Sequence, residues 1–152
     1  MTTELLEPAQ ITARLLQLLC RREYSKAELR RKMQEWQVEP ADIESQLATL
    51  SANNQQSDER FAEMLVRSKA NRGYGPLFIK QAAQPHQLPS ALLQELLTSD
   101  ERDWYALARR CYEKKYGETQ ATDVKEKQKR MAYLQRHGFT SDQIREALIQ
   151  QN

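Results

Sequence analysis

The apolar residues of this chain recur in a pattern that repeats about every fifty residues, which favours a tandem array of similar units. A shift of that size places Leu29 on Ile79 and Leu47 on Leu97, and a second shift places Leu97 on Leu148. A lone unit of this length buries little apolar surface and is only marginally stable. Neighbouring units that cover one another's edges form a quasi-linear array, so the recurrence predicts stacked repeats.

Each unit contains signals for three helices joined by short links. In the first unit, Ile11 and Leu15 begin an apolar stripe, Ser25 and Glu28 match a capping box, and Pro40 suits the first turn of a third helix. The chain has only four glycines and five prolines among 152 residues, which leaves few turns and disfavours a β-rich fold. We expect the first helix of each unit over residues 10–22, 58–71 and 100–116.

These patterns predict an all-α fold of three tandem three-helix repeats, each helix-turn-helix-like, in an elongated and curved array. The expected boundaries are a tail over 1–9 and repeats over 10–52, 53–98 and 99–152. Asp58 is expected to cap the helix that begins "ERFAEML". The insertion "YGETQATDV", at 116–124, is interpreted as a flexible loop.

The stretch "RGYGP", at 72–76, raises the question of a phosphate-binding loop. It lacks the lysine and hydroxyl residue of such a loop, and no strand pattern precedes it. We instead expect a helix–helix turn, in which Gly73 ends one helix in a left-handed conformation and Gly75 and Pro76 begin the next. Arg72 and Tyr74 would then lie on a tight, exposed corner.

No other pattern predicts catalysis. Cys20, Cys111, His86 and His137 show no metal-ligand spacing. The cysteines are expected to be buried thiols on apolar stripes, and the histidines ordinary residues of exposed links. No Ser/His/Asp set is suggested. We therefore expect a protein that is not an enzyme and that has no cofactor and no metal.

Composition and charge limit what the chain can bind and where it can be located. The net charge is +2 with a pI near 8.5, which by itself does not imply nucleic-acid binding. No apolar run approaches the length of a membrane span and no signal segment opens the chain. We expect a cytoplasmic monomer that does not bind membranes.

Clusters of basic residues are the more informative feature. Between Arg109 and Arg130, eight Lys/Arg stand against four acids, with tyrosines interleaved. Solvated helix faces would explain any one cluster, but three clusters at helix ends of corresponding units favour contact with phosphate or an acidic partner. Trp36 and Trp104 are expected in the core, whereas Tyr74 sits between two glycines, where a core role is hard to arrange. The predicted partner-contacting residues are Arg21, Arg22, Arg72, Tyr74, Arg109, Arg110, Lys114 and Lys115.

Several segments together resemble one protein family. They are "SKAELRRKM", "DERFAEMLV", "RSKANRGYGPLFIKQ", "DWYALARRCYEKKYGE" and "KRMAYLQRHGF", in this order. Their combination resembles the RecX family, bacterial regulators of the RecA recombinase, over about Ile11 to Leu148. The resemblance implies three tandem three-helix repeats, binding along the RecA filament on DNA, and inhibition of its ATPase, strand-exchange and coprotease activities. Recombination and the SOS response would be restrained as a result.

Two other functions remain open at this point. A helix-turn-helix transcriptional regulator would read a defined duplex in the major groove without RecA, although such readers usually carry a far more basic face. A structural scaffold would make no nucleic-acid contact. DNA, single- or double-stranded, is thus a second candidate partner beside RecA.

Overall fold

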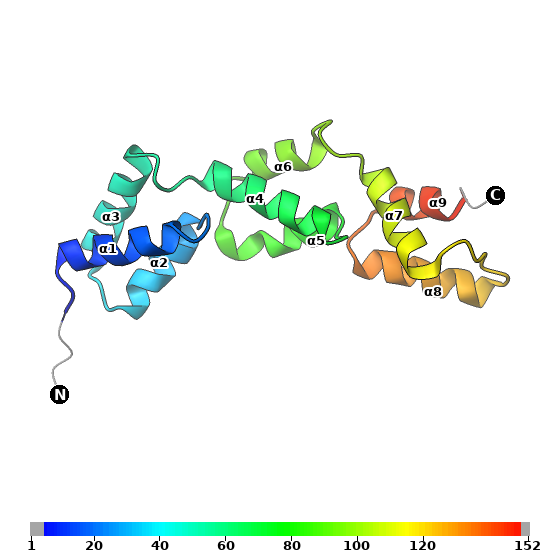
Figure 1. Cartoon of the computed structure of the whole chain (residues 1–152), viewed down its shortest axis with the longest axis horizontal. Coiled ribbons are helices and arrows are strands. Elements are labelled where there is room, and N and C mark those ends of the chain that lie inside the picture. The colour runs from blue at the N-terminus through cyan, green and yellow to red at the C-terminus, as the bar shows by residue number, and fades with distance from the viewer. Residues whose placement is uncertain (1–4, 150–152) are drawn as a thin grey trace. The chain divides into compact units, whose positions relative to one another are not determined.

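The computed structural model describes residues 5–149, which fold into helices and connecting segments without a strand (Figure 1). In order, the helices are α1 (Pro8–Leu19), α2 (Lys26–Glu35), α3 (Pro40–Ala52), α4 (Asp58–Asn71), α5 (Pro76–Ala82), the 3₁₀ turn η1 (Gln84–His86), α6 (Ser90–Thr98), α7 (Trp104–Tyr116), α8 (Val124–Arg136) and α9 (Ser141–Ile149). The prediction of an all-α chain built from three-helix repeats is confirmed. No helix in the described range is long and apolar enough to cross a membrane.

Two compact units divide the chain. The first takes the residues up to Met64 together with Pro85–Pro89, and the second takes Leu65–Gln84 together with the chain from Ser90 onward. The division crosses α4. The repeat boundaries expected from the sequence follow the recurrence of apolar residues and stay a prediction.

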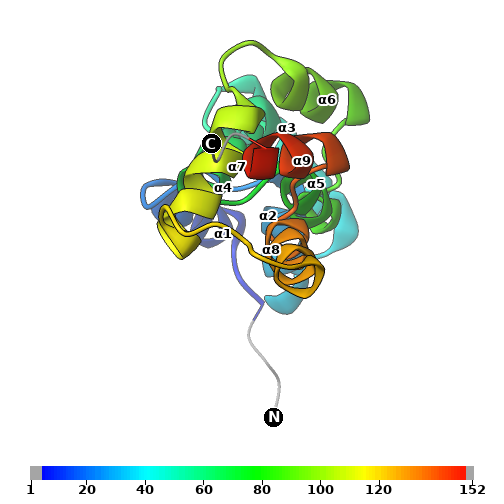
Figure 2. The ribbon, with the colours of Figure 1, turned by 90° about the vertical axis from the view of Figure 1, so that its right-hand side faces the viewer.

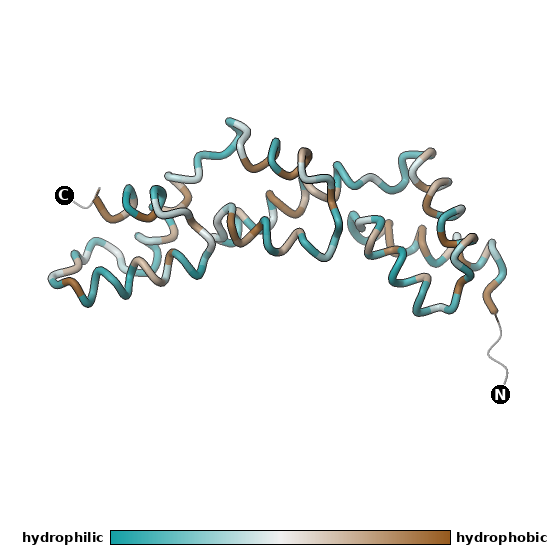
Figure 3. The backbone as a smooth tube through the Cα atoms, turned by 180° about the vertical axis from the view of Figure 1, so that it is seen from behind, coloured by the Kyte–Doolittle hydropathy of each residue, from teal (hydrophilic) through white to brown (hydrophobic). Residues whose placement is uncertain are grey.

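The core of the first unit forms where α1, α2 and α3 turn their apolar stripes inward. Ile11, Leu15, Leu29 and Leu47 are all buried there, as the spacing predicts. Figure 3 shows hydrophobic stretches alternating with hydrophilic ones along the backbone. Trp36 packs against this core while half-buried, and the Arg14 guanidinium lies 5.3 Å from the centre of its ring. The core position expected for Trp36 is thus only partly reached.

Helix starts follow the local capping chemistry. Ser25 Oγ accepts from the Glu28 N–H and the Glu28 carboxylate accepts from the Ser25 N–H, which confirms the capping box. Reciprocal bonds between Glu7 and Gln10 start α1 at Pro8, two residues before the predicted start. Asp103 caps α7, which therefore begins at Trp104 and not at 100.

The predicted cap at Asp58 is wrong. Ser57 Oγ accepts from the N–H of Arg60, three residues on, so Ser57 holds the capping position of α4. The Asp58 carboxylate accepts instead from the Lys26 backbone N–H and from Gln56 Nε2, each at 3.0 Å. It thereby ties the start of α4 to the start of α2.

Only one of the two cysteines is buried. Cys111 lies inside α7 and Trp104, on the same helix, is also buried. Cys20 is exposed, contrary to the prediction, because α1 ends at Leu19 and the residue that follows leaves the apolar stripe.

In the second unit, α9 packs against both α7 and α8 (Figure 2). Arg130 of α8 is buried among these elements, with 5% of its surface exposed. Its guanidinium donates to Tyr112 Oη (2.9 Å) and to the Thr119 carbonyl oxygen (2.6 Å). The insertion at 116–124, interpreted from the sequence as a flexible loop, is therefore fastened to α7 and α8 by one buried cation.

Candidate binding cleft

The "RGYGP" corner joins α4 to α5 as predicted. Gly73 has a φ of +92°, and the Tyr74 N–H reaches back across it to the Lys69 carbonyl oxygen at 3.1 Å. Gly75 is the residue before α5, and Pro76 takes the first helical position. The prediction of a helix–helix turn is confirmed.

This corner rests on the turn that follows α8. The Gly75 N–H donates to the His137 carbonyl oxygen (2.6 Å), and the Leu77 N–H donates to the Gly138 carbonyl oxygen (2.9 Å). A Cβ at Gly75 would lie only 2.6 Å from the Gly138 oxygen, so the backbones meet where neither residue has a side chain. We call this contact the glycine joint; it sets α4 and α5 against α8.

Tyr74 is part of this packing and is not on an exposed corner. Its ring stacks on Phe78, with centroids 3.9 Å apart, and lies 5.5 Å from the His137 ring. The side chain is therefore half-buried, whereas Arg72 beside it is exposed. The glycine joint explains the difference, because it draws the segment after Gly73 against the third repeat.

Four of the eight predicted contact residues line one cleft of about 490 Å³. Arg72 comes from the end of α4, and Arg110, Lys114 and Lys115 come from α7. Tyr133 and His137, at the end of α8, also line the cleft. We call this hollow the basic cleft.

The charge of the basic cleft is not neutralised from within. None of its four cations forms an ion pair with any residue between 5 and 149, and no acidic side chain lines it. Arg110 and Lys114 stand four residues apart on α7, a spacing at which like charges repel. Such an arrangement is unfavourable without an anionic ligand and favourable with one.

Two neighbouring groups add no negative charge near neutral pH. Burial raises the pKa of the Cys111 thiol above its ordinary value. Burial, with the adjacent Cys111, also raises the pKa of Tyr133. Lys115 Nζ lies 5.5 Å from the centre of the Tyr133 ring, so an aromatic face helps to position this cation.

Arg109 does not face the basic cleft. Its Nε lies 3.1 Å from the Glu113 carboxylate, one turn along α7, and the two line a separate hollow with Arg110. Successive residues on a helix point about 100° apart, and of this pair only Arg110 lines both hollows.

Arg21 and Arg22 belong to the first unit, where Arg22, Arg30 and Arg60 form ion pairs with acids. Arg22 lies 2.7 Å from Glu28, and its guanidinium stacks 3.6 Å from the Tyr24 ring centre. The hydrogen bond to Glu28 raises the pKa of Arg22. Burial would raise the pKa of Glu28, but hydrogen bonds from Arg22 and the Ser25 backbone outweigh it and lower that pKa. Arg21 is exposed, and its side chain forms no ion pair with any residue of the described range.

Sequence reasoning overlooked Tyr133 and His137 as lining residues. Tyr133 lies in the last turn of α8 and His137 directly follows that helix, four residues on; His137 Nδ1 lies 3.0 Å from the Tyr133 carbonyl oxygen. That spacing places two aromatic side chains on one helical face, which is the signal that could have marked them.

His86 was predicted to be an ordinary residue of an exposed link, and this is wrong. Its Nδ1 lies 2.8 Å from Ser25 Oγ and 3.7 Å from the Glu28 carboxylate, and its ring packs 4.4 Å from the Phe61 ring. Arg31 supports the same turn by donating to the Pro85 carbonyl oxygen at 2.8 Å. His86 therefore fastens η1 to the start of α2.

Stability of the first unit is expected to fall below about pH 6.5, and His86 is the cause. Burial is the largest effect and lowers the pKa of His86. Glu28 opposes it, Arg31 and Arg22 act with it, and Asp58 opposes it least. The unfolded chain therefore takes up the proton first as pH falls, so this stabilisation is complete above the ordinary histidine pKa and is lost toward the lower folded-state value.

The measurement is thermal melting of wild type and His86→Gln between pH 7.5 and 5. The wild type should lose more stability on acidification than the variant. Equal losses would contradict a half-buried neutral imidazole at this position.

Comparisons of the sequence identify its relatives. Models of the second and third three-helix domains of RecX match residues 57–97 and 101–148. The Regulatory protein RecX of Stenotrophomonas maltophilia strain K279a is 39% identical over 134 residues, covering 88% of this chain and 82% of that protein. The Regulatory protein RecX of Haemophilus influenzae strain PittEE is 41% identical over 142 residues, covering 91% of each chain.

Solved structures share the fold. The crystal structure of RecX from Lactobacillus salivarius superposes with a TM-score of 0.80 at 18% identity, over 95% of this chain and 96% of that one. A second crystal structure of a regulatory protein RecX gives a TM-score of 0.76 at 22% identity, over 91% of this chain and 70% of that one. With the domain matches and the relatives near 40% identity, these findings show that the chain belongs to the RecX family of regulatory proteins.

Proposed function

We propose that this protein binds the RecA recombinase, free or as a filament on DNA, and inhibits its ATPase, strand-exchange and coprotease activities. It would thereby restrain recombination and the SOS response in the cytoplasm, acting as a monomer by binding and without catalysing a reaction. The observation that carries the proposal is the basic cleft, whose four cations have no counter-ion of their own in the described chain. Membership of a family of regulatory proteins supports the same role.

The basic cleft suits both surfaces that a nucleoprotein filament offers. Arg72 and Arg110 can form paired hydrogen bonds with carboxylates of the protein or with DNA phosphates. Lys114 and Lys115 act as point charges on longer stems. A ligand that binds one state of the filament better than another shifts the filament toward that state. Inhibition follows if the favoured state cannot complete an ATPase cycle.

The test is RecA ATPase on single-stranded DNA with this protein added at less than one molecule per RecA protomer. We expect the steady-state rate to fall well below the rate without it. Bovine serum albumin at equal concentration is the control for non-specific effects. No change in rate at any ratio would remove the proposal.

A helix-turn-helix regulator of transcription is the alternative, because its recognition helices would also present cations to phosphates. It differs in that a defined duplex sequence would be bound in the absence of RecA. Binding of labelled duplexes from a random pool, with RecA omitted, separates the two. Enrichment of one sequence would favour the alternative, and uniform weak binding would favour RecA regulation.

A further inference from the structure

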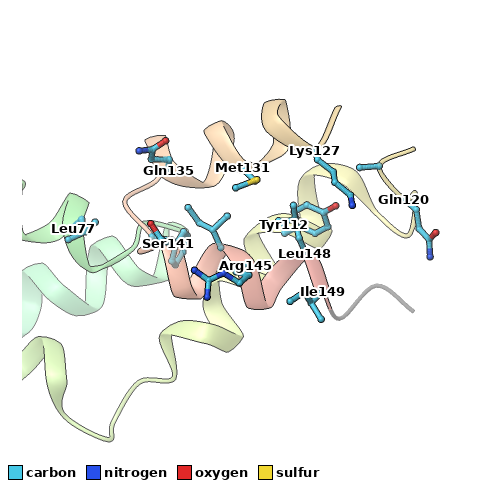
Figure 4. Close-up of a pocket in the computed structure, with 13 residues that line it drawn as sticks. Leu77, Tyr112, Gln120, Lys127, Met131, Gln135, Ser141, Arg145, Leu148 and Ile149 are labelled. Atoms are coloured by element: carbon cyan, nitrogen blue, oxygen red, sulfur yellow. The ribbon is translucent and has the colours of Figure 1, made fainter. Parts of the chain in front are cut away.

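An apolar groove opens on the second unit (Figure 4), and none of its lining residues lines the basic cleft. It has a volume of about 680 Å³ and is lined by α7, α8, α9, the two segments that connect them and one side chain of α5. Tyr112, Phe139 and Ile144 form its buried floor, with exposed fractions of 1%, 1% and 5%. We call it the α8–α9 groove.

The apolar side chains on the walls of the α8–α9 groove are open to solvent, and Gln120, Gln135 and Ser141 line it beside them. Leu77, Met131 and Ile149 line it with exposed fractions of 52%, 45% and 61%, and the half-buried Leu148 lies beside them. A contiguous exposed apolar surface over a well-packed floor marks an interaction site more often than scattered single residues do.

The charges at the groove have one sign. Lys127 and Arg145 are its charged lining residues, and no acidic side chain is among the described residues that line it. Arg145 lies 3.4 Å from Asp142 in a pair whose members are both about two-thirds exposed, whereas Lys127 makes no ion pair with any described residue. Exposed pairs of this kind bind weakly and exchange readily for a better partner. A ligand complementary in charge to the α8–α9 groove is therefore acidic.

The shape of the groove suits a helix. One of its walls, α9, has nine residues and spans about 13 Å, or two to three helical turns. With its rim residues about half exposed, the groove would cover one face of an occupant and leave the rest in water, which fits an amphipathic helix better than an enclosed small molecule.

We propose that the α8–α9 groove binds an acidic amphipathic helix of a partner protein. Apolar side chains at i, i+4 and i+7 of that helix pack on Met131 and Leu148, and flanking carboxylates meet Lys127 and Arg145. The groove shares no residue with the basic cleft, so this proposal stands whether or not RecA is the partner.

The test uses the full chain and two fluorescein-labelled helical peptides of about fifteen residues. Both carry leucines at i, i+4 and i+7; one has glutamates at the flanking positions and the other has lysines. Fluorescence anisotropy should show the acidic peptide binding at least about ten-fold more tightly than the basic one, equivalent to ~1.4 kcal/mol.

Variants locate the binding. Met131→Glu should weaken the acidic peptide at least about ten-fold, because it places a like charge in the apolar wall. The double variant Lys127→Glu/Arg145→Glu should lose the acidic peptide and gain the basic one. Lys125→Glu/Lys129→Glu is its matched control, since these exposed residues of α8 change the net charge equally but do not line the groove. It should retain the preference for the acidic peptide.

Circular dichroism melts establish that each variant is folded, and the gain of basic-peptide binding cannot come from an unfolded groove. Equal binding of both peptides, absence of binding at high micromolar concentration, or equal loss in the control variant would each overturn the proposal. Loss on Arg110→Glu/Lys114→Glu with no loss on Met131→Glu would also overturn it, because the peptide would then occupy the basic cleft.

Discussion

Replacing Gly138 with alanine is expected to destabilise the second unit by about 3–5 kcal/mol. Gly138 has a φ of +90°, a conformation that costs an L-residue roughly 1–2 kcal/mol. A Cβ there would also lie 2.3 Å from the backbone nitrogen and the Cβ of Phe78, which cannot move without displacing α5. Moving the two turns apart to make room for this Cβ breaks the hydrogen bonds donated by the Gly75 and Leu77 N–H groups. Each of them contributes about 1 kcal/mol. Urea denaturation followed by circular dichroism measures the loss.

Two other glycines serve as matched controls for this variant. Gly73 has a φ of +92°, but nothing lies within 4 Å of an added Cβ, so Gly73→Ala should show only the backbone cost of about 1–2 kcal/mol. Gly75 needs no positive φ but is blocked by the Gly138 oxygen, so Gly75→Ala isolates the steric part. If Gly138→Ala costs no more than Gly73→Ala, the joint is not a tight contact.

The sequence predicts the turn that contains Gly75, which is one side of the glycine joint. It does not predict that this turn packs on Gly138. A helix–helix turn is indicated by Gly73, Gly75 and Pro76, because glycine and proline have conformational preferences of their own. That Gly75 meets Gly138 depends on how two distant turns pack. This contact cannot be recognised in a single sequence, because apolar periodicity indicates which face of a helix is buried but not which element packs on that face. The half-burial of Tyr74 follows from the same contact and was missed for the same reason.

His86 and Ser57 illustrate two different reasons for a wrong prediction. His86 bonds to Ser25, 61 residues away, so no local pattern could reveal its partner. Ser57 lies next to the residue predicted as the cap, and both are good capping residues. Which of two neighbouring residues caps the helix depends on whether one of them hydrogen-bonds elsewhere. Asp58 does, because it accepts from the Lys26 N–H at the start of α2.

The basic cleft was partly predictable. Charge clustering predicts contacts for Arg72, Arg110, Lys114 and Lys115, among others, and the structure brings these four to one hollow. Helical geometry alone could have separated Arg109 from Arg110, because adjacent residues face different directions. The approach of Arg72 to α7 could not be foreseen, since it requires the packing that the glycine joint fixes.

Reversing two charges of the basic cleft should nearly abolish inhibition of RecA. For Arg110→Glu/Lys114→Glu we expect the concentration for half-maximal inhibition of RecA ATPase to rise about 100-fold. That factor corresponds to ~3 kcal/mol, reasonable for two cations that would otherwise meet anions in a desolvated contact. Thermal stability should change little, because both side chains are exposed, neither has an ion pair in the described chain, and their mutual repulsion is not a stabilising contact.

The specificity of this effect is judged against Lys125→Glu/Lys129→Glu, which makes the same change in net charge on α8 outside the basic cleft. If long-range attraction were the cause, both double variants would weaken inhibition alike, and both losses would shrink at high salt. If direct contact is the cause, only the cleft variant fails, and the neutral Arg110→Gln/Lys114→Gln falls between it and wild type. Equal loss in the two charge-reversed proteins would therefore remove the basic cleft as the site, while leaving the RecA proposal to be judged by the wild-type assay alone.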